Sequence, residues 1–383
     1  MKVSLLRKIS ISITTLMASS TAFAGMDIDS RVTQLENQMQ QVRTETAMGT
    51  YGAQTATARA EVDGYGWFFT TDILYWRARV GGTEFAYTNN TQTTKVPLKG
   101  TIKNIDFDWN WGLRVGAGYN FDHDGWDFRL GYTLFHNSGN SSANAGLHGI
   151  VIPLKGSERI TVLLDQVPQN VFVFSKSAKA QYDFNYEGID VNIGRAYYMS
   201  SKVSHRPHWG LKTTWIDQEQ IVRYTGGDQI AEDGEMLGLG DDTVQVKEDC
   251  NFWGLGPRLG IDSKWYLGYG ISAFGDIAGA LVFGQFDLGY QELYTRKLPE
   301  TSIKLNGHRH AFSPNMQMRL GLRYDAYLHD NKQHIGVGVG FEANYWWRQN
   351  QMLIMSESFS VKSTKISEDV SMHGLTVDFK WDF

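Results

Sequence analysis

The sequence contains one cysteine, Cys250, and only seven prolines in 383 residues. A lone cysteine excludes a framework of intramolecular disulfides, and the chain shows no Cys or His spacing that suits a metal cluster. After residue 24, no stretch approaches the ~18 consecutive apolar residues of a membrane-spanning helix. Helical periodicity is almost absent from the body of the chain, which argues against the usual soluble helical and mixed folds.

The first 24 residues have the composition of an export signal. Lys2, Arg7 and Lys8 form a positively charged start, residues 9–18 are mostly apolar, and residues 22–24 read Ala-Phe-Ala. This order predicts a secretory signal peptide over residues 1–24, cut after Ala24. A membrane anchor is the less favoured reading, because the apolar stretch has about half the ~20 residues that a spanning helix needs.

Residues 25–62 follow a different pattern. Ile28, Val32, Leu35, Met39 and Val42 are spaced alternately by four and three residues, which is typical of an amphipathic helix in a short coiled coil. Two interpretations stay open. One is a periplasmic helix that assembles copies of the chain into a homo-oligomer such as a trimer. The other is a helix that packs on the rim of the barrel or remains loosely ordered. Residues 47–62, rich in Ala, Thr and Gly, are expected to form a linker.

Strict alternation of apolar and polar residues begins after this linker. Between positions 105 and 121 every odd residue is apolar and every even residue is polar or glycine. The odd positions are Ile105, Phe107, Trp109, Trp111, Leu113, Val115, Ala117, Tyr119 and Phe121. Successive side chains of a strand point to opposite faces, so one face is wholly apolar. The run is longer than the ~9–11 residues that a tilted strand needs to cross a bilayer.

The alternation recurs to the end of the chain, where Leu375, Val377, Phe379, Trp381 and Phe383 are the apolar set. A sheet with lipid on one face must close into a ring, because every backbone polar group needs a partner. The sequence therefore predicts an all-β fold, a transmembrane antiparallel β-barrel over 63–383 with about ten strands and a range of about 8–12. The expected strands are 65–80, 104–121, 125–136, 178–195, 207–224, 250–262, 267–291, 309–328, 334–347 and 372–383.

Two short connections set the expected registers. A turn at residues 122–125 and another around residues 330–331 place apolar residues opposite apolar residues across the strands. The predicted pairs are Phe121 with Trp126, Tyr119 with Phe128, Ala117 with Leu130, Gly118 with Arg129, Leu320 with Phe341, Leu322 with Val339 and Arg319 with Glu342. The final strand is expected to pair with the first near residues 67–76 and so to close the ring.

Connection lengths predict the orientation of the barrel. Periplasmic turns of such barrels are short and extracellular loops are long. The turns at 122–125 and 329–333 are therefore expected in the periplasm, with both termini. The segments 137–177, 226–247, 292–309 and 348–370 are expected outside the cell. We expect the protein in the bacterial outer membrane, in contact with its lipid and lipopolysaccharide, and inserted by the barrel-assembly machinery, with Phe383 as the assembly signal.

Several motifs of the chain resemble those of a known protein family. The N-terminal coiled-coil pattern, the stretches 66–69 (GWFF) and 72–76 (DILYW), and the stretch 251–260 (NFWGLGPRLG) followed by Trp265 resemble the Legionella-type major outer membrane proteins, which have relatives in chlamydia-related bacteria. The resemblance covers roughly residues 28–383. These motifs are strand signatures and not a catalytic fingerprint. The resemblance implies a pore-forming outer-membrane protein with no catalytic residues to carry over.

Candidate functional residues are the charges expected on the inward face. These are Arg114, Arg129, Arg258, Arg319, Arg323, Asp106, Asp108, Asp127, Asp325 and Glu342. Opposed charges across a water-filled lumen filter solutes by size and charge, which favours a porin for ions and small hydrophilic solutes. The alternative is a narrow barrel plugged by its own side chains. Inward glycines, such as Gly118, Gly131 and Gly338, favour open space, although they equally suit strand twist or a packed aromatic ring.

Three other functions are weighed against the porin. His136 and Ser138 have the His-x-Ser spacing of outer-membrane phospholipases, but no third catalytic partner is visible, and Gly139-Asn140 departs from that family's Asn-Gly. His308 and His310 are able to bind a metal or anion, although loop histidines are more often solvated. A structural or adhesin barrel that acts through its loops, for example the acidic segment 228–242, is the main alternative. We expect no catalysis, no cofactor, no bound metal and no nucleic-acid partner.

Overall fold

The computed structural model describes residues 66–383 except 90–99, 123, 146–148, 157–171, 174, 201, 227, 231–235, 239–242, 296–300, 329–332, 357–361 and 366. The predicted signal peptide over 1–24 and the helix and linker predicted over 25–62 lie outside the described residues. Within the described ranges, no helix is long and apolar enough to cross a membrane.

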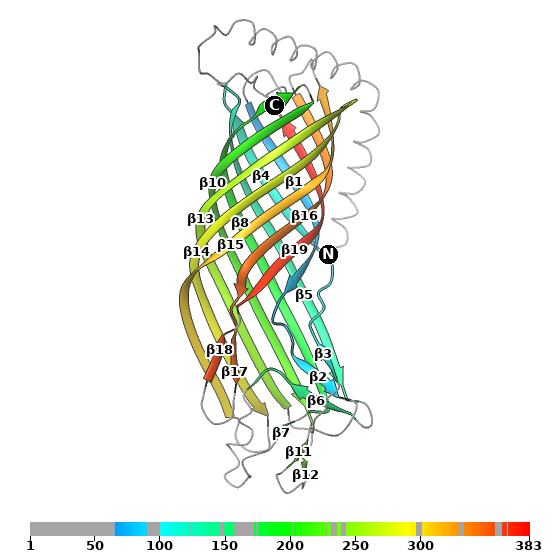
Figure 1. Cartoon of the computed structure of the whole chain (residues 1–383), viewed down its shortest axis with the longest axis vertical. Coiled ribbons are helices and arrows are strands. Elements are labelled where there is room, and N and C mark those ends of the chain that lie inside the picture. Colours follow the sequence, from blue (N-terminus) through cyan, green and yellow to red (C-terminus); the bar gives the residue numbers. More distant parts are fainter. Residues whose placement is uncertain are drawn as a thin grey trace, which may run out of the picture.

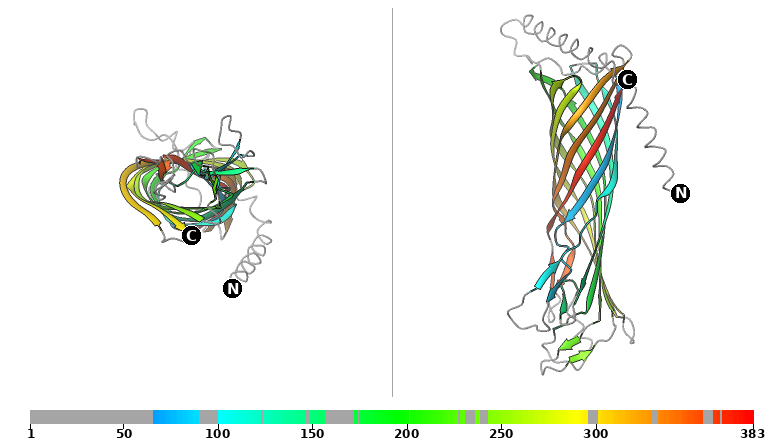
Figure 2. Two further views of the ribbon diagram at one scale, coloured as in Figure 1. Left: turned by 90° about the horizontal axis from the view of Figure 1, so that it is seen from below. Right: turned by 90° about the vertical axis from the view of Figure 1, so that its right-hand side faces the viewer.

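Ten antiparallel strands of the described chain form one closed ring (Figures 1 and 2). They are β1 (Gly66–Val80), β4 (Asn110–Asn120), β5 (Trp126–Asn144), β8 (Ser177–Arg195), β10 (Val203–Thr225), β13 (Thr243–Gly268), β14 (Ile271–Thr295), β15 (Thr301–Leu328), β16 (Gln333–Asn350) and β19 (Glu368–Asp382). Their order round the ring is the order of the sequence, with β19 paired to β1. The predicted ten-stranded β-barrel is therefore confirmed.

The two ends of the barrel differ in their connections. At the turn end, β4–β5 and β13–β14 are joined by tight hairpins in which Asp124, Gly125, Tyr269 and Gly270 have positive φ, as such turns require. The short strand β9 (Tyr197–Ser200) also pairs with β10 at this end. The loop end carries short strands outside the ring. These are β2 (Ala86–Asn89), β3 (Gly100–Lys103), β6 (Ile150–Pro153), β7 (Phe172–Val173), β11 (Asp228–Ile230), β12 (Met236–Gly238), β17 (Leu353–Ser356) and β18 (Lys362–Lys365).

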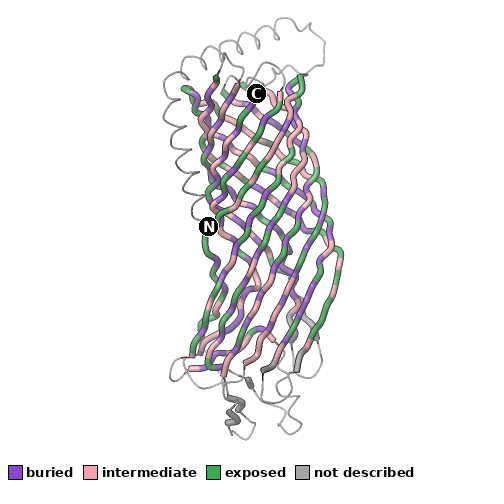
Figure 3. The backbone as a smooth tube through the Cα atoms, turned by 180° about the vertical axis from the view of Figure 1, so that it is seen from behind, coloured by how far each residue is buried: buried purple, intermediate pink, exposed green. Residues whose placement is uncertain are grey.

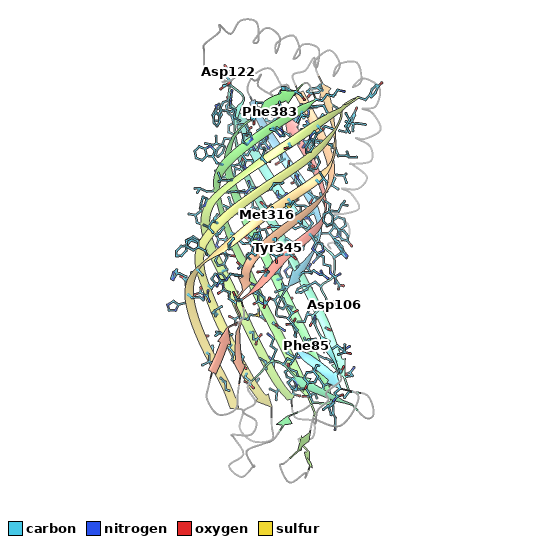
Figure 4. The ribbon with its side chains drawn as sticks, in the orientation of Figure 1. Phe85, Asp106, Asp122, Met316, Tyr345 and Phe383 are labelled. Carbon is cyan, nitrogen blue, oxygen red and sulfur yellow. The ribbon has the colours of Figure 1, made fainter. Side chains whose placement is uncertain are left out.

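Labelled side chains locate these ends in the picture. Figure 4 shows Phe383 and Asp122 at the turn end, Tyr345 and Met316 about midway, and Phe85 toward the loop end. The ring thus extends well beyond the level of Tyr345 and forms an elongated cylinder.

The predicted registers agree with the pairing in the structure. Strands β4 and β5 pair Tyr119 with Phe128 and Gly118 with Arg129, and Phe121 donates its N–H to the carbonyl of Trp126 at 2.9 Å. The remaining predicted pairs, Ala117 with Leu130, Leu320 with Phe341, Leu322 with Val339 and Arg319 with Glu342, are also present. A shift by one residue exchanges the faces of a strand, so these pairings fix which side chains enter the lumen.

Several predicted strand limits are wrong. Strands β13, β14 and β15 have 26, 25 and 28 residues, so the segment 292–309, expected to be a loop, is mostly strand. The run 105–121 is not one strand, because β4 begins only at Asn110. The chain leaves the sheet between Phe107 and Asn110, so the alternation of inward and outward side chains before this break does not continue in β4. The alternation predicted that Ile105 and Phe107 face outward. This prediction is wrong, because both residues are buried.

The polarity of the alternation inverts partway along the long strands. On β10 the outward Trp209, Leu211 and Trp215 are 58%, 51% and 38% exposed. The outward residues that follow are Asp217, Glu219, Ile221 and Arg223. The inward side changes from charged to largely uncharged: Arg206, His208 and Lys212 precede Ile216, Val222 and Tyr224, with Gln218 and Gln220 between them. Figure 3 shows buried and exposed residues alternating along the strands on both sides of this change.

The same inversion occurs on neighbouring strands. Strand β8 has outward Lys179 to Glu187 followed by Ile189, Val191 and Ile193, and strand β5 changes from outward Leu134 to His136. We call the part with outward apolar residues the turn half, and the part beyond the row of Trp215 and Trp253 the loop half. An apolar outer surface over a polar lumen belongs in lipid, and a polar outer surface over an apolar core belongs in water.

Aromatic residues mark both edges of the turn half. Toward the loop half, the ring of Tyr75 lies 5.5 Å from that of Trp109 and 4.7 Å from that of Trp111. At the turn end, Phe69 stacks on Phe383 with centroids 5.8 Å apart. Exposed aromatic residues at these levels include Trp67, Phe121, Trp126, Trp215, Trp253 and Trp381. Two such girdles are typical of barrels that cross a bilayer.

The β1–β19 pairing predicts a specific cross-link. Thr71 and Phe379 are direct partners on the outward face, so cysteines at both positions lie within the Cα separation that a disulfide tolerates. The double variant Thr71→Cys/Phe379→Cys should oxidise spontaneously and give a faster-migrating, circularised chain on denaturing gels. Thr71→Cys/Val377→Cys is the control, because Val377 pairs with Ile73 and is displaced by two residues. Efficient cross-linking of the control alone would contradict the register.

Candidate functional site

Ion pairs in the lumen of the turn half join neighbouring strands and also strands that lie farther apart in the ring. Arg114 on β4 lies 3.0 Å from the Asp72 carboxylate on β1 and 2.6 Å from Glu342 on β16. Asp72 and Glu342 are almost completely buried. Since both carboxylates point toward one guanidinium, the charges of three strands are neutralised at a single point inside the ring.

Arg319 and Arg323 extend this network along β15. Arg319 lies 2.7 Å from Asp276, and Asp72 and Asp378 are each 3.7 Å from its guanidinium. Arg323 pairs with Asp378 at 2.9 Å and with Asp325 at 3.1 Å. Asp378 therefore contacts both arginines and extends the network to β19.

A second cluster lies on the opposite wall of the turn half. Arg206 on β10 contacts Asp127 at 2.5 Å, Asp262 at 2.9 Å and the Asn192 side-chain oxygen at 2.8 Å. Arg129, which is more exposed, shares both Asp127 and Asp262. Paired guanidinium and carboxylate groups of this kind keep ionised side chains stable away from bulk water.

Most of the predicted lumen residues point inward and meet one another. Those that do are Arg114, Arg129, Arg258, Arg319, Arg323, Asp127, Asp325 and Glu342. Asp106 and Asp108 do not: both are exposed, and Asp106 faces Arg77 at 3.9 Å with 88% of its side chain accessible. The break after Phe107 turns these two residues outward, so their prediction as lumen residues is wrong. That the inward charges line a conducting pore stays a prediction.

Several lumen charges were missed by the sequence argument. They are Asp72, Asp190, Arg206, Lys212, Asp262 and Asp276, all inward and ion-paired. The sequence contained one indication that these residues face inward: they lie on the strand face opposite outward apolar residues such as Trp209 and Ile277. It was obscured because the same face becomes apolar further along the strand, as with Leu74 and Trp76 after Asp72.

The inward glycines leave less room than the sequence suggests. The ring of Phe68 covers Gly118, the Arg323 guanidinium covers Gly336, and Asp378 covers Gly338. Gly131 differs, since no atom lies within 4 Å of the place where its Cβ would be. Glycines here mostly make room for a large neighbouring side chain. Of the alternatives that the sequence left open, this agrees best with packing of a side chain over the glycine.

A cavity of about 200 Å³ remains in the middle of the charged lumen. Gly131 faces it, together with Arg129, Asp190, Arg258 and Gln317. Arg258 reaches Gln317 at 3.0 Å and Asp190 at 3.4 Å. The space is polar and large enough for several water molecules.

An aromatic layer crosses the lumen where the loop half begins. Tyr186 on β8 and Trp346 on β16 have ring centroids 6.2 Å apart, although four strands separate β8 from β16 on either side of the ring. The Lys212 ammonium lies 6.0 Å and 5.9 Å from these two rings. Trp76 and Phe135 pack at the same level, with centroids 5.6 Å apart. Contact between opposite walls means that this layer closes the lumen in the structure.

Beyond this layer, the loop half contains an apolar core and a buried ion pair. Phe184, Ile216, Phe252 and Phe286 are fully or almost fully buried there. Lys155, just after β6, lies 2.8 Å from Glu248 on β13, and only 1% of each side chain is exposed. Its ammonium also donates to the Gly82 carbonyl at 3.2 Å. Since β13 lies opposite β1, Lys155 ties the loop-end segments across the mouth of the barrel.

The structure locates the other candidate residues on the outer surface. His136 and Ser138 both face outward in the loop half, and His136 Nδ1 contacts the side-chain oxygen of Asn185 on β8. The sequence showed no third partner for the His136 and Ser138 pair, and Asn185 is a polar group beside His136 that it did not reveal. Among the described residues, however, no hydrogen bond joins His136 to Ser138. His308 and His310 are exposed on β15. No group of three or more potential metal ligands occurs in the described ranges.

Comparison with known proteins identifies one family. Residues 63–383 match the family model described as Legionella pneumophila major outer membrane protein precursor. No curated protein sequence matches the chain.

Solved structures that are similar to the chain have low sequence identity to it and TM-scores below 0.5. The outer membrane protease OmpT from Escherichia coli has 8% identity and a TM-score of 0.34, with 83% of this chain and 97% of OmpT covered. A FadL homologue of Pseudomonas aeruginosa has 5% identity and a TM-score of 0.25, with coverage of 86% and 93%. The transport unit of the autotransporter AIDA-I from Escherichia coli has 8% identity and a TM-score of 0.24, with coverage of 91% and 98%.

The buried ion pairs predict a stability difference between two arginines. Removal of Arg206 leaves Asp127 and Asp262 with less compensation inside the lumen, so Arg206→Ala should cost about 3–5 kcal/mol of unfolding free energy. Arg195→Ala is the matched control, because its pair with Asp124 is partly exposed at the turn end and is worth about 0–1 kcal/mol. Denaturant unfolding from lipid vesicles, followed by tryptophan fluorescence, measures both. Equal losses would contradict the assigned role of Arg206.

Proposed function

Because the chain belongs to the Legionella major outer membrane protein family, we propose that it is a porin-like protein of the outer membrane. Ions and small hydrophilic solutes pass through its charged lumen. The observation that carries this proposal is the polar cavity of about 200 Å³ between the two ion-paired clusters of the turn half. Opposed charges around such a space order water and select solutes by charge.

The turn end is assigned to the periplasm in this proposal. Its described hairpins are tight, whereas the loop end carries the additional strands β2, β3, β6, β7, β11, β12, β17 and β18. Short periplasmic turns and longer external loops are the rule for outer-membrane barrels. Phe383, whose N–H donates to the Trp67 carbonyl at 3.1 Å, then lies at the periplasmic rim, where a terminal aromatic residue is suited to assembly and sealing.

The aromatic layer acts as the gate of the proposed pore. Tyr186 and Trp346 meet across the lumen, and the core of the loop half lies beyond them. An apolar constriction excludes water and blocks ions until its side chains separate. The proposed pore therefore conducts in brief openings, when Tyr186 and Trp346 move apart and the segments tied by Lys155 are displaced.

A structural or adhesin barrel is the second candidate. The observation that favours it is the polar outer wall of the loop half, which presents Lys179, Asp183, Asp217 and Arg223 to water. The side chains of the acidic segment 228–242 lie outside the described residues. This candidate requires no movement of the aromatic layer, so it predicts a folded barrel without conductance.

The gate predicts opposite results for two adjacent tryptophans. Trp346 is fully buried in the layer, whereas Trp347 faces outward and is 38% exposed. Trp346→Ala should raise the open probability in planar bilayers several-fold, because it removes one side of the constriction. Trp347→Ala should leave conductance unchanged. A folded Trp346→Ala protein that remains non-conducting would favour the structural barrel.

The charged lumen predicts a change in ion selectivity. Arg129 borders the cavity with 37% of its side chain exposed, so its charge acts on passing ions. Arg129→Glu should shift the reversal potential toward cation selectivity in a salt gradient. Arg195→Glu at the turn end is the comparison, with a smaller shift. An unchanged reversal potential in the Arg129 variant would show that ions do not pass this cavity.

A further inference from the structure

A hollow of about 390 Å³ lies on the outer surface of the loop half, across β5, β8 and β10. Its outward side chains occupy two adjacent rows of the sheet. Lys179 pairs with Ser142 on one side and Arg223 on the other, and Gln181 pairs with Asn140 and Ile221 in the same way. The rows bring two cations, three uncharged polar groups and one aliphatic side chain together.

The charge of this hollow is not balanced as it is in the lumen. No carboxylate is among the residues that line it, and neither Lys179 nor Arg223 has a carboxylate partner among the described residues. Arg223 uses its Nε to donate to the Gln245 side chain at 2.8 Å, which is one of its five donors. The nearest acidic row, with Asp183 and Glu219, lies toward the turn half.

The acidic row has its own partners. Glu219 pairs with Lys247 at 2.7 Å, and Asp183 accepts a hydrogen bond from Gln181 at 3.2 Å. These contacts hold the carboxylates at the edge of the hollow. Two cations beside hydroxyl and amide groups suit a ligand that combines phosphate or carboxylate with sugar hydroxyls. The volume is also within the range of about 300–1,000 Å³ for small-ligand sites.

The level of the hollow restricts where its ligand comes from. Arg223 is eight residues beyond the girdle residue Trp215 on β10. At ~3.3 Å per residue and the usual strand tilt of about 35–45°, this distance is roughly 20 Å along the membrane normal. The hollow also faces sideways, away from the lumen. Its ligand therefore belongs to the layer just outside the lipid, beside the barrel.

We infer that this hollow binds the anionic core oligosaccharide of lipopolysaccharide in the surrounding outer leaflet. Lys179 and Arg223 bind its phosphate or carboxylate groups, and Ser142, Asn140 and Gln181 bind its hydroxyls. Ile221 provides an apolar surface for a sugar ring. The inference rests on the proposed orientation, in which the loop end faces outward, but it requires no conducting pore.

Calorimetric titration of the full chain in detergent tests this site. The probe is core oligosaccharide freed of lipid A, with its phosphates intact. Lys179→Ala/Arg223→Ala should weaken binding about 100-fold, and Lys179→Arg should retain it. Arg79→Ala is the matched control, because Arg79 is an exposed outward arginine on β1, away from the hollow. Heat-modifiable migration on gels verifies that each variant is folded.

Further variants separate the possible results. Ser142→Trp fills the hollow without a change of charge and should also abolish binding. Dephosphorylated oligosaccharide should bind at least 10-fold more weakly if phosphate is the recognised group. Equal affinity of the wild type and the double variant, or an equal loss in Arg79→Ala, would overturn the site. Binding of soluble chondroitin sulfate in place of the core oligosaccharide would overturn the assignment to lipopolysaccharide. Because detergent exposes both ends, the result is independent of orientation and conductance.

Discussion

The structure depends on the closure of the sheet by the hydrogen bonds between β1 and β19. Within lipid, each backbone N–H and C=O needs a partner from the chain itself, so an open edge is excluded. The pairing of residues 68–80 with residues 370–382 supplies the last set of partners. Once the ring is closed, strand alternation divides the side chains into an inward and an outward set. Every later property of the molecule, including the ion pairs of Arg114 and the girdles, follows from that division.

The two halves of the barrel use this division in opposite ways. In the turn half, lipid-facing residues such as Leu211 surround buried charges, and each charge must find a partner because unpaired ions are expensive away from water. In the loop half, the outward Asp217 is solvated and residues such as Phe184 form a core inside the ring. The Tyr186–Trp346 contact lies at the junction. The proposed filter and the proposed gate are therefore consequences of one change in strand polarity.

The sequence predicted the ring, its strand number and the registers, because these depend on local alternation and turn residues. The pairing of Arg319 with Glu342 was predictable in this way. The inversion was not, since apolar residues were assumed to face outward along the whole strand. Tyr186 and Trp346 were therefore not recognised as residues of the lumen. The prediction that Asp106 lines the lumen was wrong for a different reason. The alternation continues through residues 105–110 although the strand does not, and a sequence pattern alone does not reveal this break.

Contacts across the ring were beyond sequence reasoning for a geometrical reason. Lys155 and Glu248, or Arg114 and Glu342, belong to elements that only closure of the barrel brings together. The inversion of polarity between Trp215 and Asp217 is measured with spin labels at the outward positions of β10 from Trp209 to Arg223. Oxygen should reach the labels up to Trp215, and a water-soluble nickel complex should reach those from Asp217 onward. If oxygen reaches all of these labels equally, as far as Arg223, lipid covers the whole outer face of β10 and the polarity does not invert.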